Sequence, residues 1–553
     1  MKKIFKIILA SLVVVFITTT ACKESFLIKN PQGVVDPNVL ANEEGLEYLI
    51  IGAYSSLDGW LGWGLGPWET AGSNWVYGDV YSDDAYKGSE SGDQSPMNAI
   101  ERYEQLPPNP YYRAKWIFVY DGISRANDVL KVINVALDKG AIDQALADQM
   151  AGEARFLRGH FHLEAIKLWD NVPYVDEFNI DGLIPNTSIP YPQVEADFQF
   201  AYDNLGATGR NGEVGRATKW AAAAMLGKTY LMQGKYAEAK TVLTDIIQNG
   251  GFSLVPNYHD NFRMATENNS ESIFQIQHAV NDGTGDGDNG TWSDQLSGIQ
   301  GGPGACCGFH QPTINLVNAY KTESGLPLLA TFGKDYNQSD DLSDLGIGNN
   351  GTWNATNAYL KGNYVTRIDP ADPNVNLAYK ATANNTGVDP LLEVDTLNWK
   401  IVWAEDDAIP LDPRLDWTVG RRGIPYLDWG NHPGINWIRL QSNGGPYSPK
   451  KMMYYNSDAS NVDAGAWSAV SSLNYNLIRY ADVLLMAAEA EVEAGSLTTA
   501  RTYVNEVRAR AGNSAGFVKN DDGSDAANYV VDVYPVGGAL DPFQTQAGGR
   551  EAV

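Results

Sequence analysis

Residues 216–250, RATKWAAAAMLGKTYLMQGKYAEAKTVLTDIIQNG, contain the pattern that decides the fold. In the first half, apolar or small residues return every three or four positions, which is the spacing of one helical face. They are Trp220, Ala223, Ala224, Gly227, Tyr230 and Leu231. Gly234 ends this helix. A second face follows at Tyr236, Ala239, Val242, Leu243, Ile246 and Ile247. The stretch predicts two helices packed as a hairpin.

The hairpin also matches the tetratricopeptide pattern at Leu226, Gly227, Tyr230, Ala239, Leu243 and Pro256, although Ala223 stands at the consensus tryptophan position. Residues 474–512 read as a second pair of helices, and residues 141–169 as a further helix. One such pair cannot bury its apolar face alone, so at least about three are expected. Helical hairpins without a true repeat are the alternative; the Leu-Gly-x-x-Tyr match favours repeats.

The chain divides into regions of different composition. Residues 40–250 and 474–511 are expected to be mostly helical. The intervening segment is rich in Gly, Asn, Asp, Pro and Trp and includes a strand-like piece, SIFQIQHAV, at 272–280. We therefore predict a mainly α fold, a tetratricopeptide-like scaffold of helical hairpins with a long loop-rich insertion containing short strands. The expected divisions are 1–21, 22–250, 251–473 and 474–553.

The N-terminal segment resembles a secretory signal peptide. Lys2, Lys3 and Lys6 precede an apolar run at 7–17, which is shorter than the roughly 20 residues needed to span a bilayer. The following FITTTACKE at 16–24 resembles a bacterial lipobox, which predicts cleavage before Cys22 and its acylation. The lipid would anchor the chain to a membrane. An ordinary signal cut near an incidental Cys22 is the alternative.

Composition excludes some functions. The formal net charge of −27 argues against nucleic-acid binding, which depends on neutralising phosphates with Lys and Arg. It also disfavours a highly sulfated polysaccharide as ligand, although a local patch could override the total. The other two cysteines, Cys306 and Cys307, are expected to be thiols, with a strained vicinal disulfide as the alternative.

Three further segments share a resemblance. Residues 153–175 (EARFLRGHFHLEAIKLWDNVPYV), 474–495 (NYNLIRYADVLLMAAEAEVEAG) and 73–88 (SNWVYGDVYSDDAYKG) resemble the SusD/RagB family of Bacteroidetes outer-membrane lipoproteins. Together with the lipobox-like start and the interrupted repeats, the resemblance covers nearly the whole chain. Because family members usually continue beyond an Arg-Glu-rich helix start, it also implies that a chain stopping at residues 550–553 is truncated.

The resemblance implies a function. It implies a cell-surface protein that binds an oligosaccharide or polysaccharide, caps a SusC-like TonB-dependent transporter and has no catalytic activity. Peptide or other nutrient ligands also occur on this scaffold. Two alternatives remain: a glycan-degrading enzyme on the same surface, and a tetratricopeptide adaptor that binds only protein partners.

Candidate ligand residues lie on loops. Glycan binding needs flat apolar faces for sugar rings and polar groups for hydroxyls, and Trp and Tyr supply such faces. Trp60, Trp63, Trp68 and Trp75 lie in a glycine-rich stretch. By analogy with the family, the expected ligand residues are Trp68, Asn74, Trp75, Tyr77 and Asp79, with Trp292 opposite. The alternative is that each tryptophan fills the small core of the loop layer.

Other motifs do not predict chemistry. Residues 512–516 match GxSxG, but no histidine follows, as the hydrolase arrangement requires. The acidic stretch around Asp286 is expected to be a solvated loop, with calcium binding as the alternative. His160 and His162 are two apart, point to different helix faces and are expected on the surface. We therefore expect no catalytic residues, no metal and no cofactor.

Overall fold

The computed structural model describes most of the chain between residue 37 and the C-terminus. The described ranges are 37–59, 66–179, 183–284, 289–329, 352–361, 363–368, 370, 376–392, 398–403, 410–463, 465–466, 468 and 470–553. The expected signal peptide, Cys22, Trp60, Trp63 and Asp286 lie outside these residues. Their roles stay predictions.

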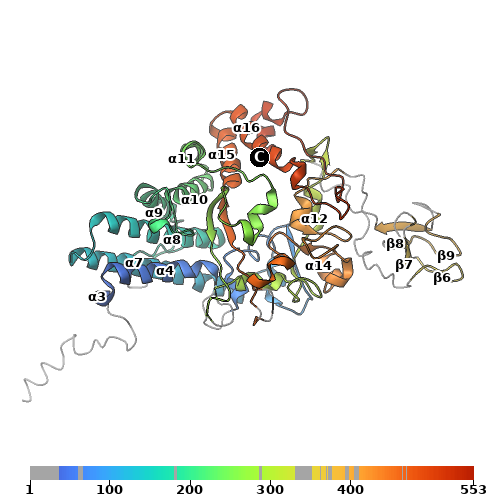
Figure 1. The fold of residues 1–553 in the computed structure, drawn as a ribbon, viewed down its shortest axis with the longest axis horizontal. Coiled ribbons are helices and arrows are strands. Elements are labelled where there is room, and N and C mark those ends of the chain that lie inside the picture. The colour runs from blue at the N-terminus through green and yellow to red at the C-terminus, as the bar shows by residue number, and fades with distance from the viewer. Residues whose placement is uncertain are drawn as a thin grey trace, which may run out of the picture.

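Long helices form the scaffold, and each packs on the next along the series α7–α8–α9–α10–α11–α15–α16 (Figure 1). They are α7 (Pro110–Asp138), α8 (Gln144–Trp169), α9 (Tyr191–Asn204), α10 (Lys219–Leu231), α11 (Tyr236–Asn249), α15 (Tyr480–Ala494) and α16 (Leu497–Ala511). At either end of the chain, α3 (Pro37–Leu40) and α4 (Glu43–Tyr54) lie against α7, and α17 (Gln546–Ala552) packs against α15. The mainly helical fold is confirmed.

The predicted hairpin at 216–250 is present as α10 and α11. The Thr218 hydroxyl accepts a hydrogen bond from the Ala221 amide and caps the first helix. Gly234 turns the chain with a φ of +69°. A Cβ atom at Gly227 would lie 2.7 Å from Leu243 Cδ2, so a side chain larger than glycine would push the helices apart. The small-residue face therefore sets the close approach of the two helices.

The second predicted pair needs one correction. α15 and α16 form, but Tyr475–Arg479 is the strand β13 and not part of a helix. β13 pairs antiparallel with β2 (Ser272–Ile276), within the predicted strand-like piece. Tyr475 lies opposite Ile276 in this register. The hydrogen bonds of this ladder come from a segment about 200 residues away in sequence, so local periodicity did not indicate them.

The loop-rich part is built from short elements. Its strands are β1 (Ala85–Gly88), β3 (Phe309–Pro312), β4 (Thr322–Glu323), β5 (Leu326–Pro327), β11 (Val419–Gly420) and β12 (Ser448–Pro449). Its helices are α5 (Pro67–Thr70), α6 (Pro96–Glu101), α12 (Ile314–Ala319), α13 (Leu415–Thr418), α14 (Gln441–Gly444) and the 3₁₀ turn η6 (Trp292–Ser297). β1 pairs with β3, which joins an early loop to the insertion.

A small β unit projects from the body, at the right of Figure 1. It contains β6 (Ala358–Tyr359), β7 (Tyr364–Ile368), β8 (Asn376–Ala381), β9 (Asn385–Thr386) and β10 (Trp399–Trp403). The strand order of its larger sheet is β10–β8–β7. Tyr359, Val365, Tyr379, Ala381 and Trp399 form its own small core.

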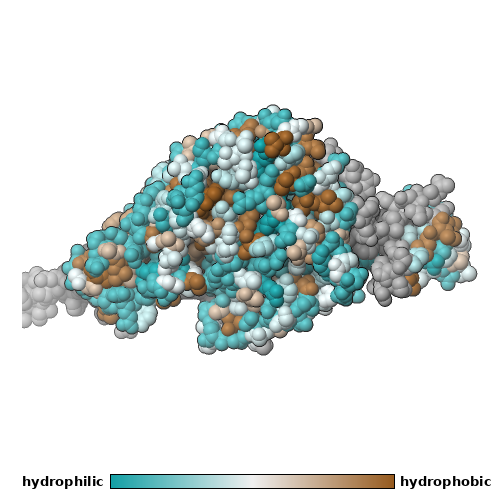
Figure 2. All heavy atoms as spheres, turned by 45° about the horizontal axis from the view of Figure 1, so that its top comes forward, coloured by the Kyte–Doolittle hydropathy of each residue, from teal (hydrophilic) through white to brown (hydrophobic). Residues whose placement is uncertain are grey.

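The surface is mixed in character. On the face shown in Figure 2, apolar side chains gather in separate patches surrounded by hydrophilic ones. Within the described part of the chain, no helix combines the length and apolarity that crossing a bilayer requires.

The expectation for His160 and His162 was wrong, because both are buried within α8. Burial lowers the pKa of His160 to about 4 and that of His162 to about 3, so both are neutral at pH 7. His162 Nε2 accepts a hydrogen bond from the Val175 amide. Both faces of α8 are covered, by α7 on one side and α9 on the other.

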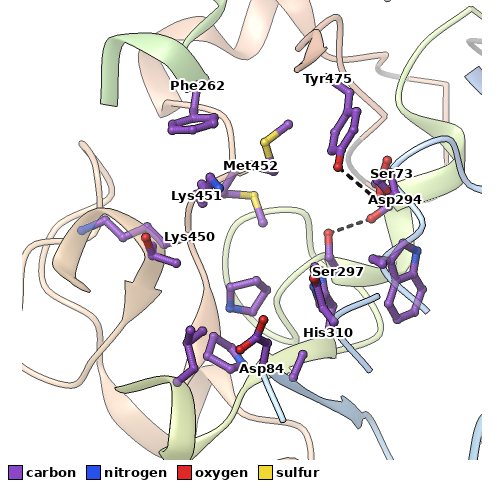
Figure 3. Close-up of a pocket in the computed structure, with 18 of the residues that line it drawn as sticks. Ser73, Asp84, Phe262, Asp294, Ser297, His310, Lys450, Lys451, Met452 and Tyr475 are labelled. Atoms are coloured by element: carbon purple, nitrogen blue, oxygen red, sulfur yellow. Dashed lines mark hydrogen bonds and ion pairs between the residues drawn. The ribbon is translucent and has the colours of Figure 1, made fainter. Parts of the chain in front are cut away.

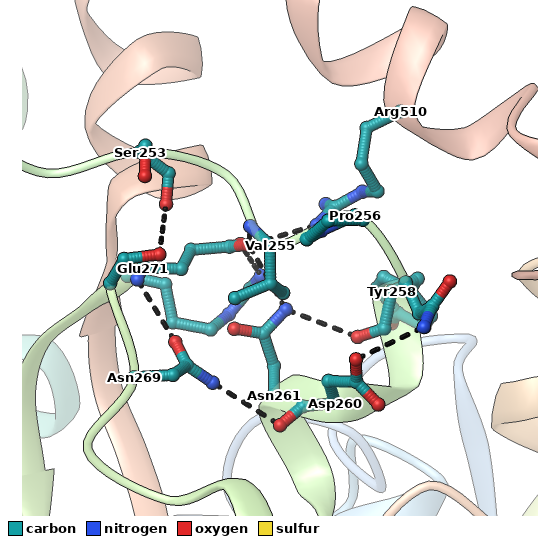
Figure 4. A network of polar contacts seen from close by, with 12 residues as sticks. Ser253, Val255, Pro256, Tyr258, Asp260, Asn261, Asn269, Glu271 and Arg510 are labelled. Carbon is teal, nitrogen blue, oxygen red and sulfur yellow. Dashed lines mark hydrogen bonds and ion pairs between the residues drawn. The ribbon is translucent and has the colours of Figure 1, made fainter.

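A buried carboxylate joins the insertion to the C-terminal helices (Figure 4). Glu271 is fully buried, and its Oε1 accepts from Arg479 Nη1 at 2.8 Å. Its Oε2 accepts from Arg510 Nη1 at 2.8 Å. The same oxygen accepts from the Val255 amide and from Asn261 Nδ2, both at 3.1 Å. One side chain thus connects segments that lie more than 200 residues apart in sequence.

We expect Glu271→Gln to lower the free energy of unfolding by about 3 kcal/mol, because it leaves the buried Arg510 without its counter-charge and Arg479 with Asp482 alone. Urea unfolding followed by tryptophan fluorescence would measure the change. Glu323→Gln, on an exposed position of β4, is the control and should change stability by less than about 0.5 kcal/mol. Equal effects of the two substitutions would contradict the structural role of Glu271.

Candidate functional site

A cavity of about 420 Å³ lies where three distant parts of the chain meet. The early loop and β1 contribute Ser73, Trp75, Asp79, Asp84 and Ala85. The insertion contributes Phe262, η6, β3, α12 and the segment from β12 onward, and β13 with α15 completes the wall. This volume falls in the range of about 300–1,000 Å³ that is typical of small-ligand sites. The described residues contain no group of three or more His, Cys, Asp or Glu side chains that could hold a metal ion.

The apolar walls come from aromatic and methionine side chains. The Trp75 ring lies against the His310 ring, with centroids 5.2 Å apart, and meets the Phe309 ring edge-on at 6.4 Å. On the other side, Phe262 and Met452 line the cavity (Figure 3). Such walls can contact the C–H faces of a ring-shaped ligand.

The cavity also contains carboxylates in different environments. Asp79 Oδ2 lies 2.7 Å from His310 Nε2. Burial would raise the pKa of Asp79, but the hydrogen bond and electrostatic attraction of His310, together with the charge of Lys451, hold that pKa below its usual value. Burial raises the pKa of Asp294, although its carboxylate accepts from the Ser73 hydroxyl at 2.5 Å. Asp84 is exposed at the cavity edge, and no hydrogen bond to its carboxylate is formed within the described part of the chain.

Three cationic side chains line the cavity, and two of them are occupied by the protein itself. Lys450 is buried and donates to the carbonyl oxygens of Asp416 and Pro425, and burial lowers its pKa to about 7. Arg479 pairs with Glu271 and with Asp482. Lys451 differs, because its Nζ lies 4.6 Å from the Phe262 ring centroid and has no carboxylate of the described residues within ion-pair distance.

The structure places two of the sequence-predicted ligand residues in the wall of the cavity and the others away from it. Trp75 and Asp79 line the cavity. Asn74 does not, and its amide donates to Glu164 of α8. The Tyr77 hydroxyl donates to the carbonyl oxygens of Glu69 and Tyr111 in the interior.

The two remaining tryptophans also lie away from the lining. Trp68 is half-buried against the core that contains Trp75 and Tyr77. Trp292 is buried, with 9% of its surface exposed. Contact of Trp68, Asn74, Tyr77 and Trp292 with a ligand stays a prediction, and their positions favour a structural role.

Several lining residues were missed by sequence reasoning. Phe262, His310, Lys451, Tyr475 and Arg479 come from segments separated by up to about 200 residues, and no local motif joins them. The pair Lys450-Lys451, in a Gly- and Pro-rich stretch of an acidic chain, was the one available signal.

Cys306 and Cys307 are joined in a vicinal disulfide, which corrects the expectation of two thiols. The backbone turns sharply here, with positive φ at Ala305 and Cys307, and this brings the adjacent side chains together. Cys307 belongs to the core of the early loop layer, and Cys306 packs against that core.

The fold and the cavity define a helical-repeat protein with a ligand-sized cavity in its loop layer. Two family models match the chain: "SusD family" over residues 270–533 and "Starch-binding associating with outer membrane" over residues 59–231. The chain belongs to the SusD/RagB family. The resemblance drawn from three short segments is thus confirmed, and the second model describes association with the outer membrane.

Individual relatives share low sequence identity with this chain. A SusD-like protein of Bacteroides ovatus is 26% identical over 292 residues, which are 49% of this chain and 50% of that protein. The chain therefore matches about half the length of this curated relative. The crystal structure of a SusD-like protein from Bacteroides fragilis has a TM-score of 0.62 at 18% identity, covering 95% of this chain and 85% of that one. Surface glycan-binding protein A from Bacteroides thetaiotaomicron, solved with laminarihexaose, has a TM-score of 0.55 at 17% identity, covering 86% and 84%.

We expect Trp75→Ala to destabilise the protein by about 3–5 kcal/mol, because it removes a large buried ring from the early loop core. The thermal midpoint measured by circular dichroism would report the loss. Tyr81→Ala, in the same segment but 37% exposed, is the matched control and should cost less than about 1 kcal/mol. A wild-type midpoint for Trp75→Ala would show that the ring is not part of the core.

Proposed function

We propose that this protein is a cell-surface lipoprotein, anchored through Cys22, that captures an oligosaccharide in the cavity between β1, β3 and β13. It passes the sugar to a SusC-like TonB-dependent transporter. The observation that carries the proposal is the cavity itself, which combines ring-sized apolar walls with polar groups at its edge. Membership of the SusD/RagB family and the laminarihexaose bound by a relative of similar fold support a glycan as the ligand.

Hydrogen-bonding groups at the cavity fit sugar hydroxyls. Asp84 offers two carboxylate oxygens at the cavity edge, and a hydroxyl can donate to either. Ser297 and Asn476 also line the cavity, but the Ser297 hydroxyl donates to the Asp294 carbonyl oxygen and the Asn476 amide is bonded to Asn261 and Gln275. Hydrogen bonds to a charged acceptor are stronger than those between neutral groups, so Asp84 should contribute most of the polar affinity.

We propose binding without hydrolysis. Glycosidases use two carboxyl groups, one as a proton donor and the other as a base or nucleophile. Within the described cavity lining, Asp79 is engaged with His310, Asp294 with Ser73, and Asp482 with Arg479. Asp84 is the carboxylate of the described lining whose oxygens accept no hydrogen bond from the protein, and the match to the SusD family supports binding rather than hydrolysis.

The hypothesis of a tetratricopeptide adaptor that binds only proteins explains the helical repeats but not the cavity. It assigns no ligand to the cavity, whereas the proposed function uses the repeat scaffold for the transporter and the loop layer for the sugar. The exposed side of α11 is the repeat surface that we assign to the transporter.

Affinity electrophoresis against plant, algal and fungal polysaccharides tests the proposal, with release of new reducing ends assayed in the same samples. We expect retardation by one glycan class and no new reducing ends. Asp84→Ala should weaken binding about tenfold, the loss expected for a hydrogen bond to a charged group. Asp83→Ala, the exposed neighbour outside the lining, should bind like the wild type. New reducing ends would show that the protein hydrolyses the glycan, which contradicts a role in binding alone. No retardation by any glycan would reject the proposal.

Delivery is tested by co-purification with the transporter from outer membranes. We expect Ala237→Arg with Thr241→Arg, two exposed positions one turn apart on α11, to reduce the transporter recovered, because two long charged side chains would obstruct the contact. Thr356→Arg with Asn357→Arg, exposed on the β unit, is the control and should recover it fully. Unchanged recovery with the α11 variant would exclude this surface as the contact.

A further inference from the structure

We propose that the cavity selects sugars that carry an anionic substituent, a carboxylate or a sulfate ester, and that Lys451 is the residue that binds it. The inference rests on the proposed function and names its substrate class. Neither family membership nor the bound ligand of a relative specifies this charge.

The first observation is the hydrogen-bond or ion-pair partner of each basic side chain in the cavity. His310 is engaged with Asp79, Lys450 with two carbonyl oxygens, and Arg479 with two carboxylates. Lys451 Nζ has neither an ion pair nor a hydrogen bond within the described residues. Its ammonium group therefore keeps three donors for a ligand.

The second observation is the surroundings of that ammonium group. Lys451 is half-buried and lies over the ring of Phe262, which is itself 3% exposed. Figure 3 shows Lys451, Phe262 and Met452 together on one side of the cavity. Apolar neighbours reduce the water around the charge, so an ion pair formed here is worth more than one on an open surface.

The third observation is the position of the negative charge. Asp84 and His310 lie on the side of the cavity opposite Phe262 in Figure 3. Asp79 is hydrogen-bonded to His310, and Asp84 is suited to the hydroxyl groups of a sugar. The charge of Lys451 acts to lower the pKa of both carboxylates, so an anion bound at Lys451 competes with them for that charge. A ligand with an anionic group at one end and hydroxyls at the other would thus be oriented by Lys451 and Asp84 together.

The net charge of −27 does not oppose this selection at short range. Charges more than about 8 Å apart are largely screened at physiological ionic strength. A bound anion is governed by the groups that touch it. Among the cations of the described lining, Lys451 is the one whose Nζ forms no ion pair or hydrogen bond, although its charge acts at longer range on Asp79 and Asp84. The overall acidity instead slows the approach of a polyanion, which is an effect on the association rate.

The test compares matched probes. Oligosaccharides of galacturonan, mannuronan and glucuronan are each paired with their carboxyl-reduced, neutral form, and carrageenan oligosaccharides with their desulfated form. Isothermal titration calorimetry measures binding to the purified protein. We expect at least one anionic member to bind about tenfold or more tightly than its neutral counterpart, with affinity falling as salt rises. The uronate and sulfate pairs separate the two sources of the anion.

Lys451→Met keeps the length of the side chain and removes its charge. We expect it to lose the preference for the anionic member, and Lys451→Arg to retain it. Lys131→Met removes the same charge from an exposed position on α7 and is the control that should leave the preference intact. The wild-type comparison of paired probes tests the inference even if a variant does not fold.

The outcomes separate the two proposals. Binding of the neutral members as tight as that of the anionic ones, or a preference that survives Lys451→Met, would overturn the inference and leave glycan binding standing. If only neutral polysaccharides bound, the inference would likewise be overturned and glycan binding would stand. No binding of any sugar would overturn the proposed function together with the inference.

Discussion

The buried carboxylate of Glu271 connects the two halves of this molecule. It receives Arg479 from the end of β13 and Arg510 from α16, together with an amide and a backbone N–H from the start of the insertion. A buried charge is costly unless it is paired and fully hydrogen-bonded, and each oxygen of Glu271 has a partner. The network fixes β13 beside β2 and holds Arg479 in the cavity wall. The loop layer therefore takes its position from the helical scaffold.

Two adjacent lysines in the loop layer show how the tertiary structure decides whether a side chain can bind a ligand. Lys450 points into the protein, where two carbonyl oxygens bind it and burial lowers its pKa to about 7. Lys451 points into the cavity, over Phe262. The backbone turns directly after β12, where the Met453 amide donates to the Lys450 carbonyl oxygen. The two adjacent side chains leave this turn in different directions, so one lysine is structural and the other is open to a ligand.

Much of the scaffold could be predicted because its signal is local. The helical faces at 220–231 and 236–247 follow from spacing alone, and α10 and α11 match them closely. The predictions failed where distant segments decide the outcome. Tyr475–Arg479 forms a strand because β2 supplies its hydrogen bonds, and His160 is buried because α8 is covered on both sides. The pairing of Cys306 with Cys307 depends on a turn with two positive φ values.

The sequence by itself determined the class of fold and the family, because periodicity and family segments are written in consecutive residues. It also pointed to Trp75 and Asp79, which line the cavity. Only the tertiary structure decided that Tyr77 is held inside by two carbonyl oxygens, and that Phe262, His310, Lys451 and Arg479 meet around one space. Their meeting depends on long-range packing and buried ion pairs, and such contacts leave no pattern in any single stretch of the chain.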